Sequence, residues 1–174
     1  MVEMTVESVR INLATQQRVV ILKATKQERY LFIWIAQAEA YAIAVELQGT
    51  NPPRPLTHDL LKNVVGELGA KIVSIVISDL IEDIFYARIV LDVAGRHVEV
   101  DSRPSDAIAL SVRSKTPIYV EDSVLERAGV VLDTSEEQMI PRAEQKRMVQ
   151  PEENLDAYRD FINSLDVLDE FGKD

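Results

Sequence analysis

The sequence predicts an α+β fold, in which a single domain with a mixed or antiparallel sheet is packed by helices and followed by an acidic helical tail. Two patterns predict this class: runs rich in Val, Ile and aromatic residues, and segments whose apolar residues recur at helical spacing. The length of 174 residues suits one hydrophobic core. A folded chain of about 150 residues buries roughly 70% of its unfolded surface, so this chain, which has no cysteine, needs no disulfide.

The first third of the chain is expected to form three strands and a helix. Residues 5–13, 18–24 and 30–35 are dense in β-branched or aromatic side chains and are separated by polar residues, which indicates strands. Residues 37–48 are rich in alanine, which predicts a mostly buried helix, and Gly49 marks its end.

A helix and two strands follow a stiff loop that contains three prolines. Thr57 is the expected N-cap of a helix at 57–69, because apolar residues follow it at helical spacing. Strands are expected at 71–77 and 84–93, where the chain is again dense in Val and Ile.

A hairpin is expected next, and its pattern predicts which side chains face each other. If Gly95-Arg96 is the two-residue turn into a strand at 97–101, Asp92 lies opposite Glu99. Such an acidic face could bind a divalent cation through oxygen ligands. The commoner alternative is a solvated face that Arg88 partly neutralises.

The remaining elements complete a domain at residues 1–129. The apolar segment 104–114 predicts an interior helix. Residues 117–120 are expected to form a short strand, and residues 123–128 a short helix that ends at a glycine.

The acidic character of the chain belongs mainly to its last part. Residues 130–174 contain 5 lysines and arginines against 12 acidic residues, whereas residues 1–129 contain 14 against 17. Residues 130–150 are polar and lack a periodic pattern, which indicates a linker or arm. Residues 151–174 are expected to form an amphipathic C-terminal helix, whose apolar face predicts a homo-oligomer, either a dimer or a larger assembly.

Charge and hydropathy argue against several classes of protein. The net charge of −10 disfavours a high-affinity, non-specific nucleic-acid binder, but it is compatible with a nucleic acid that binds weakly as a substrate. The N-terminal residues have no apolar run of signal-peptide length, and no stretch is long enough to cross a bilayer, so no membrane partner is expected. Together with the absence of cysteine, this predicts a cytoplasmic protein.

The first cluster of polar side chains combines Arg54, His58 and Asp59 at an expected helix start. Unpaired backbone N–H groups at a helix start attract anions, so the cluster is a candidate site. The structural alternative, which the local sequence favours, is that Thr57 caps the helix while Asp59 interacts with its dipole.

A second cluster places Asp101, Arg103 and Asp106 at an expected turn from a strand into a helix. Either Ser102 or Ser105 could cap that helix, and Arg103 and Asp106 could form a local ion pair. Two carboxylates and an arginine exceed what a cap requires, so a structural and a functional role are equally open.

At these two clusters the chain resembles the bifunctional nuclease (BFN) domain family of bacteria and plants. The resemblance covers most of residues 5–120, and the two longer motifs are specific to the family. The matching segments are Ile33-Trp34-Ile35, Glu39-Ala40, residues 54–61, Phe85-Tyr86-Ala87, residues 100–110 and Pro117-Ile118.

The resemblance implies an α+β fold and a nuclease of low sequence specificity that acts on DNA and RNA. Hydrolysis of a phosphodiester needs a metal held by carboxylates, or a general base together with a cation that offsets phosphate charge. The candidate catalytic residues are therefore Arg54, His58, Asp59, Asp101, Arg103 and Asp106. A divalent cation, Mg²⁺ or Mn²⁺, is a candidate cofactor, with Glu99, Asp101 and Asp106 as candidate ligands.

The alternative function is a non-catalytic oligomeric or ligand-binding domain, in which the same residues cap helices and form a subunit interface. The geometry of Asp59, Asp101 and Asp106 separates the two functions. Carboxylates that converge on an open cleft favour a nuclease, whereas carboxylates buried in backbone caps favour the structural role.

Overall fold

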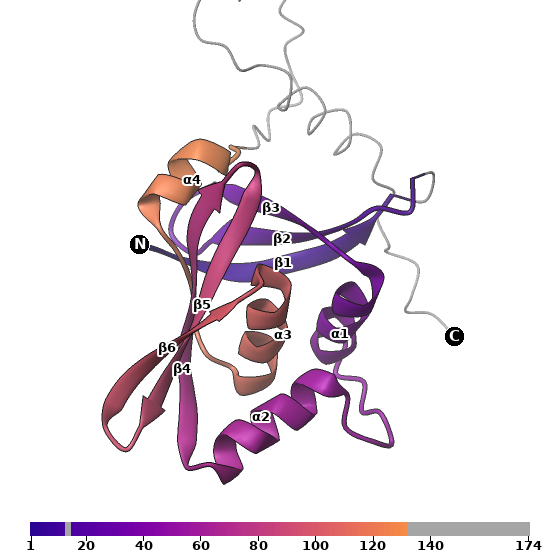
Figure 1. Cartoon of the computed structure of the whole chain (residues 1–174). Helices are drawn as coiled ribbons and strands as arrows, with labels where there is room; N and C mark the ends of the chain where they lie inside the picture. Colours follow the sequence, from indigo (N-terminus) through magenta and orange to yellow (C-terminus); the bar gives the residue numbers. More distant parts are fainter. Residues whose placement is uncertain (13–14, 132–174) are drawn as a thin grey trace, which may run out of the picture.

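The computed structural model describes residues 1–12 and 15–131, which form a seven-stranded mixed sheet and four helices (Figure 1). This arrangement confirms the α+β fold. The strands are β1 (Val2–Ile11), β2 (Arg18–Ala24), β3 (Tyr30–Ile35), β4 (Ala70–Ile81), β5 (Ile84–Val93), β6 (Arg96–Ser102) and β7 (Ile118–Val120). The helices are α1 (Gln37–Leu47), α2 (Thr57–Glu67), α3 (Pro104–Ser114) and α4 (Asp122–Ala128).

The short strand β7 joins two antiparallel halves of the sheet. The strand order is β3-β2-β1-β7-β4-β5-β6, and β7 pairs antiparallel with β1 but parallel with β4. In Figure 1 the two halves run in clearly different directions, and α3 lies in the angle between them. This bend gives the sheet a concave side, where α1 and α3 pack against each other.

Helix α3 is the central element of the core. Its residues Ala107, Ile108, Ala109 and Leu110 are buried, and they belong to one apolar cluster with β-branched residues of β2, β4 and β7. Small residues let a helix approach a sheet closely, while the larger ones fill the space between strands. The burial of α3 determines where its N-terminal end lies in the domain.

The hairpin of β5 and β6 differs from its predicted register. Its two-residue turn is Ala94-Gly95, with φ of 53° and 83°, rather than Gly95-Arg96. Two positive φ values are what a type I′ turn requires, and the right-handed twist of the flanking strands favours that turn. The predicted pairing of Asp92 with Glu99 is therefore wrong, because Asp92 faces His97 and its carboxylate accepts a hydrogen bond from the N–H of Gly95.

Two predicted helix caps also differ. The N-cap of α2 is Leu56 rather than Thr57, and the N-cap of α3 is Arg103 rather than Ser102 or Ser105. Pro104 occupies the first position of α3, where a backbone N–H has no partner within the helix, so proline's lack of an N–H costs nothing there. Leu56 and Arg103 both have the extended backbone that is typical of an N-cap residue.

Strand limits were predicted less well than strand positions. Strand β1 begins and ends earlier than predicted, and β4 extends through Ile81, four residues beyond its predicted end. The C-terminal helix predicted at 151–174, and the linker from residue 132 onward, lie outside the described residues. Within the described residues, no helix is long and apolar enough to span a membrane.

Candidate functional site

Three helices surround a hollow of about 520 Å³ on the surface of the domain. Its walls come from the first half of α1, the start of α2 and the start of α3. The polar side chains that line it are Glu39, Tyr41, Thr57, His58, Arg103 and Asp106. The hollow therefore combines residues from both polar clusters of the sequence.

His58 reaches this hollow because of how α2 begins. The preceding loop holds three prolines, which restrict the backbone, and Leu56 is the extended residue at the N-cap. In α2, His58 is the buried residue, with 8% of its surface exposed, while the apolar residues of α2 point largely to solvent. The imidazole is thus turned inward against α3.

A continuous chain of charged contacts crosses the hollow. His58 Nε2 lies 3.0 Å from Asp106 Oδ1, and Arg103 Nε donates to Asp106 Oδ2 at 2.8 Å. The same guanidinium reaches α1, where its Nη2 lies 2.9 Å from Glu39 Oε1. Both oxygens of Asp106 are engaged, so the carboxylate has one orientation.

These contacts fix the charge of Asp106. Burial raises its pKa, but the hydrogen bonds and charges of Arg103 and His58 lower it by more, so the net shift of the pKa is downward. The hydrogen bond from Arg103 to Asp106 in turn raises the pKa of the guanidinium. At neutral pH Asp106 is therefore an ionised carboxylate, which only accepts hydrogen bonds.

The ionised carboxylate determines which nitrogen of His58 carries a proton. Because Asp106 Oδ1 can only accept, the neutral imidazole must donate from Nε2. The second ring nitrogen, Nδ1, then has a free lone pair. This arrangement leaves His58 able to accept a proton from a neighbouring molecule.

Only one of the two carboxylate oxygens of Glu39 has a partner among the described residues. Its Oε1 pairs with Arg103, whereas Oε2 is buried and accepts no hydrogen bond from the described residues. With Glu39 and Asp106 ionised, the hollow holds two negative charges against one positive charge. Buried polar atoms are rarely left unpaired, so Glu39 Oε2 is a position where a donor or a cation would be stabilised.

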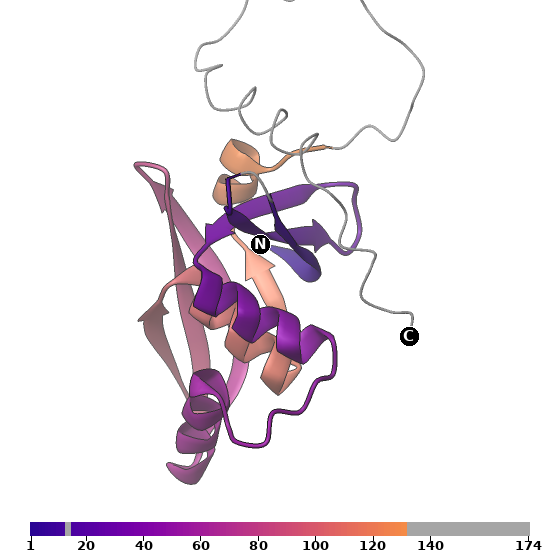
Figure 2. The same ribbon diagram turned by 90° about the vertical axis from the view of Figure 1, so that its right-hand side faces the viewer.

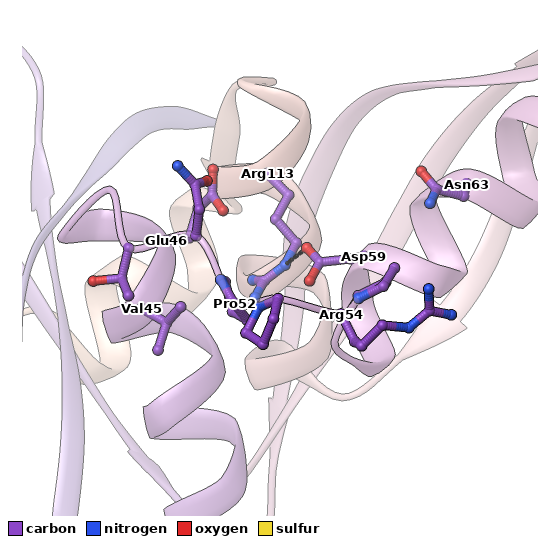
Figure 3. A pocket seen from close by; sticks show the side chains of 11 residues that line it. Val45, Glu46, Pro52, Arg54, Asp59, Asn63 and Arg113 are labelled. Carbon is purple, nitrogen blue, oxygen red and sulfur yellow. Dashed lines mark hydrogen bonds and ion pairs between the residues drawn. The ribbon is translucent and has the colours of Figure 1, made fainter.

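Asp59, the next residue of α2, does not line the hollow of His58 and has contacts of its own. Its Oδ2 accepts the N–H of Leu56 at 2.8 Å, and its Oδ1 accepts from Arg113 Nε at 2.7 Å. Arg113 is only 4% exposed, and its other nitrogens donate to the carbonyls of Ala42 and Ala109. Figure 3 shows Asp59 and Arg113 directed at each other, so this pair joins α1, α2 and α3.

The pKa of Asp59 reflects the same contacts. Burial raises it, but the hydrogen bonds from Leu56 and Arg113 lower it by more, so its net shift is downward. Arg54 lines a smaller hollow of about 250 Å³ beside this pair, and in Figure 3 its side chain points away from Arg113. Asp59 and Arg54 therefore belong to a neighbouring structural site rather than to the hollow of His58.

The remaining candidates, Glu99 and Asp101, lie on the edge strand β6. Glu99 forms an exposed ion pair with Arg88 at 2.8 Å, and Asp101 is exposed opposite Arg88 in the register. Neither lines the hollow of His58. Within residues 1–12 and 15–131, no three or more His, Asp and Glu side chains are grouped so that they could hold a metal ion.

The structure thus divides the candidates of the sequence. His58, Arg103 and Asp106 come together, Asp59 serves a cap and a buried ion pair, and Asp101 stays apart. Glu39 was missed because it reads as a polar position in an alanine-rich helix. The segment Glu39-Ala40 among the family-like residues was the one available signal for it.

Comparisons with known proteins identify a family and several relatives. The family described as the bifunctional nuclease domain matches residues 20–133. A Mycobacterium tuberculosis protein described as uncharacterized is 39% identical over 164 residues, covering 94% of this chain and 94% of that protein. Bifunctional nuclease 2 of Oryza sativa subsp. japonica is 27% identical over 120 residues, covering 67% of this chain and 37% of the rice protein. Bifunctional nuclease 1 of Oryza sativa subsp. indica is 25% identical over 120 residues, with 67% and 36% covered.

Proposed function

Because this chain belongs to the bifunctional nuclease domain family, we propose that it is a nuclease of low sequence specificity that hydrolyses phosphodiester bonds in DNA and RNA. We place the reaction in the hollow lined by Glu39, His58, Arg103 and Asp106. The observation that carries this proposal is the 3.0 Å contact of His58 Nε2 with Asp106 Oδ1, which joins the two family-like motifs inside one open hollow.

His58 is the proposed general base. Its Nδ1 accepts a proton from water, and the water oxygen bonds to phosphorus while the bond from phosphorus to the leaving oxygen breaks. The leaving oxygen keeps the bonding electrons and takes up a proton from solvent, and the imidazolium then returns its proton to solvent. Asp106 keeps the imidazole in the tautomer with a free Nδ1 and stabilises the imidazolium that forms. A general base of this kind contributes about 10²- to 10⁴-fold to a rate.

Arg103 is the proposed phosphate-binding residue. Its guanidinium has five N–H donors, of which Asp106 and Glu39 engage one each. Its side chain is 67% exposed, so the remaining donors are accessible from the hollow. A guanidinium held on two sides by carboxylates is oriented before substrate arrives, which favours binding to the charge that develops on the phosphoryl oxygens.

We expect the proposed hydrolysis to require a divalent cation. The described side chains do not form a metal site by themselves, since Glu39 and Asp106 are both bound to Arg103 and no third ligand joins them. However, the excess negative charge of the hollow would repel a phosphate. We therefore expect hydrolysis to require Mg²⁺ or Mn²⁺ in solution.

Removal of divalent cations tests this requirement. Incubation of the purified chain with EDTA is expected to reduce cleavage of labelled DNA and RNA to background, and added Mg²⁺ or Mn²⁺ is expected to restore it. The blank is the Asp101→Asn, Asp106→Asn double variant purified in the same way. Equal cleavage by wild type and blank would identify the activity as a contaminant, and the nuclease proposal would then be abandoned.

A non-catalytic oligomeric domain is the second candidate function, and the surface of α2 favours it. Leu60, Leu61 and Val64 on this helix, and Leu68 directly after it, are 42–77% exposed. Together they form an apolar surface. Such a surface is typical of a subunit interface. Self-association is thus proposed independently of catalysis, with the helix predicted at 151–174 as a further contact.

Light scattering after size-exclusion chromatography tests self-association. The full chain is expected to elute as a dimer or a larger assembly, and a chain truncated after residue 129 as a smaller one. Leu61→Glu with Val64→Glu is the matched test of α2, because two charges on an apolar interface oppose association. A full chain that stays monomeric at high concentration would exclude the oligomeric function.

A further inference from the structure

A second hollow lies on the other flank of helix α1. It has a volume of about 420 Å³ and is formed by α1 together with β1 and β2. Figures 1 and 2 show α1 between these strands on one side and α2 on the other. The hollow of His58 and this second hollow therefore lie on opposite flanks of one helix.

Tyr41 of α1 lines both hollows. Tyr41 is 60% exposed, which is high for a residue type of intermediate burial. Gln37, Ala44 and Gln48 follow the same helical strip on the side of the second hollow. The ring of Tyr41 is thus an exposed flat surface on the ridge that separates the two hollows.

The second hollow is lined by two arginines, Arg10 of β1 and Arg18 of β2. Arg10 donates to the hydroxyl of Ser8, and Arg18 donates to the carbonyl of Gln16. Among the described residues, neither guanidinium has a carboxylate partner within ion-pair distance. Two guanidinium groups that line one hollow, and that no carboxylate of the described residues pairs with, favour an anionic ligand there.

We propose that these features form one binding tract for a single strand of nucleic acid. Arg10 and Arg18 contact backbone phosphates, the ring of Tyr41 stacks on a base, and the strand continues over α1 into the hollow of His58. The tract binds with or without cleavage, and only its final position, the scissile phosphodiester over His58 and Asp106, rests on the proposed nuclease function.

The geometry favours a single strand over a duplex. An exposed aromatic ring stacks well on a base whose face is free, and in a duplex the neighbouring base pairs cover that face. A duplex also carries one negative charge per about 1.7 Å of its axis. The chain is acidic and the tract offers two arginines, so it is poorly suited to bind a ligand of such high charge density. A single strand presents fewer charges and bends over a helical ridge.

Fluorescence anisotropy of a labelled 12-nucleotide oligo-dT, measured in EDTA to prevent cleavage, tests the stacking contact. Tyr41→Ala is expected to weaken binding by about tenfold or more, because an aromatic stacking partner is lost, while Tyr41→Phe retains the affinity of the wild type. Tyr86→Ala is the matched control, since Tyr86 is also exposed but lies on β5, outside both hollows. Equal affinity of Tyr41→Ala and wild type would overturn the stacking contact.

The salt dependence of the same binding tests the two arginines. Binding weakens as salt rises, and each phosphate contact to a single strand contributes about 0.7 to the magnitude of the slope of log K against log salt. The Arg10→Gln, Arg18→Gln double variant removes two such contacts, so the magnitude of its slope is expected to be smaller by about 1.4. The control is Lys71→Gln with Arg96→Gln, which removes the same charge from the hairpin region. If both double variants show the same decrease in slope, the salt dependence reflects overall charge rather than contacts of Arg10 and Arg18, and the proposed tract is wrong.

Failure of this inference and failure of the nuclease function have different signatures. If wild type cleaves nucleic acid while Tyr41→Ala binds and cleaves normally, the tract is wrong and the nuclease function stands. If wild type binds oligo-dT through Tyr41, Arg10 and Arg18 but never cleaves it, the tract stands and the nuclease function is wrong. If a 12-base-pair duplex binds more tightly than the single strand, the preference for a single strand is refuted.

Discussion

Replacing Asp106 with asparagine is expected to slow phosphodiester hydrolysis by about two orders of magnitude or more. Asparagine keeps the size of the side chain but has no charge, and its amide group offers one oxygen where two are now used. The imidazolium of His58 would lose the carboxylate that stabilises it, and Arg103 would lose one of its two anchors. Initial rates on single-stranded DNA and RNA measure the effect.

His58 and Asp106 are expected to act as a unit. His58→Ala should then lower the rate about as much as Asp106→Asn, and the double variant should be no slower than the worse single variant. Fully additive effects would show that the two side chains act separately. Melting curves of all three variants separate a loss of catalysis from a loss of stability, since His58 is buried and Asp106 is partly buried.

Asp101→Asn provides the matched comparison for this series, because it makes the same substitution on the edge strand β6. A loss as large as that of Asp106→Asn would extend the catalytic site to β6.

Arg103→Lys addresses the phosphate contact, because lysine keeps the charge but not the planar, two-sided hydrogen bonding to Asp106 and Glu39. We expect its rate to fall while its melting temperature changes little.

The helix starts brought His58, Arg103 and Asp106 forward as candidates. Arg103 and Asp106 stand in a cluster with more charge than a cap requires, whereas the local sequence around His58 favoured a cap and the family resemblance kept it as a candidate. Their meeting could not be predicted, because it depends on how α2 lies against α3. Such packing is decided by contacts between residues far apart in the sequence, and local patterns do not record it.

Errors in the predicted fold have local physical causes. The hairpin turn was predicted one residue too late, because Gly95 was taken as the first of its two central residues while Ala94 also adopts a positive φ. Moving the turn by one residue shifts every cross-strand pair by two positions, so Asp92 lies opposite His97 and is not directly opposite Glu99. Glu99 instead pairs with Arg88, as the solvated alternative implied.

The role of Arg113 was not predicted, because an arginine in the last turn of a helix is usually explained by its favourable interaction with the helix dipole. The structure makes it a buried connection between three helices. Arg113→Met is expected to lower the free energy of unfolding by about 3 kcal/mol, near the low end for a broken buried pair because Asp59 is 29% exposed. For a chain of this size, this corresponds to a fall in Tm of roughly 6–12 °C.

The pH dependence of stability identifies Asp59 as the partner responsible. The pKa of Asp59 is lowered on folding, so its contribution is fully present above the pKa of the unfolded chain, about 4, and is lost as pH falls through the folded pKa. Asp59→Asn should therefore be clearly less stable than wild type at pH 7, with the difference shrinking below about pH 4. A difference that stays constant down to pH 3 would contradict the ion pair.

A control and a double-mutant cycle complete the test of Arg113. Arg88→Met removes an arginine from an exposed ion pair with Glu99, and it is expected to cost less than about 1 kcal/mol, since surface pairs contribute little. Asp59→Asn combined with Arg113→Met is expected to be less destabilising than the sum of the single changes, because each single variant leaves a polar group without its partner. Denaturant unfolding at pH 7 measures all of these variants. Purely additive effects, or an Arg113→Met variant as stable as Arg88→Met, would show that the buried pair does not hold α1, α2 and α3 together.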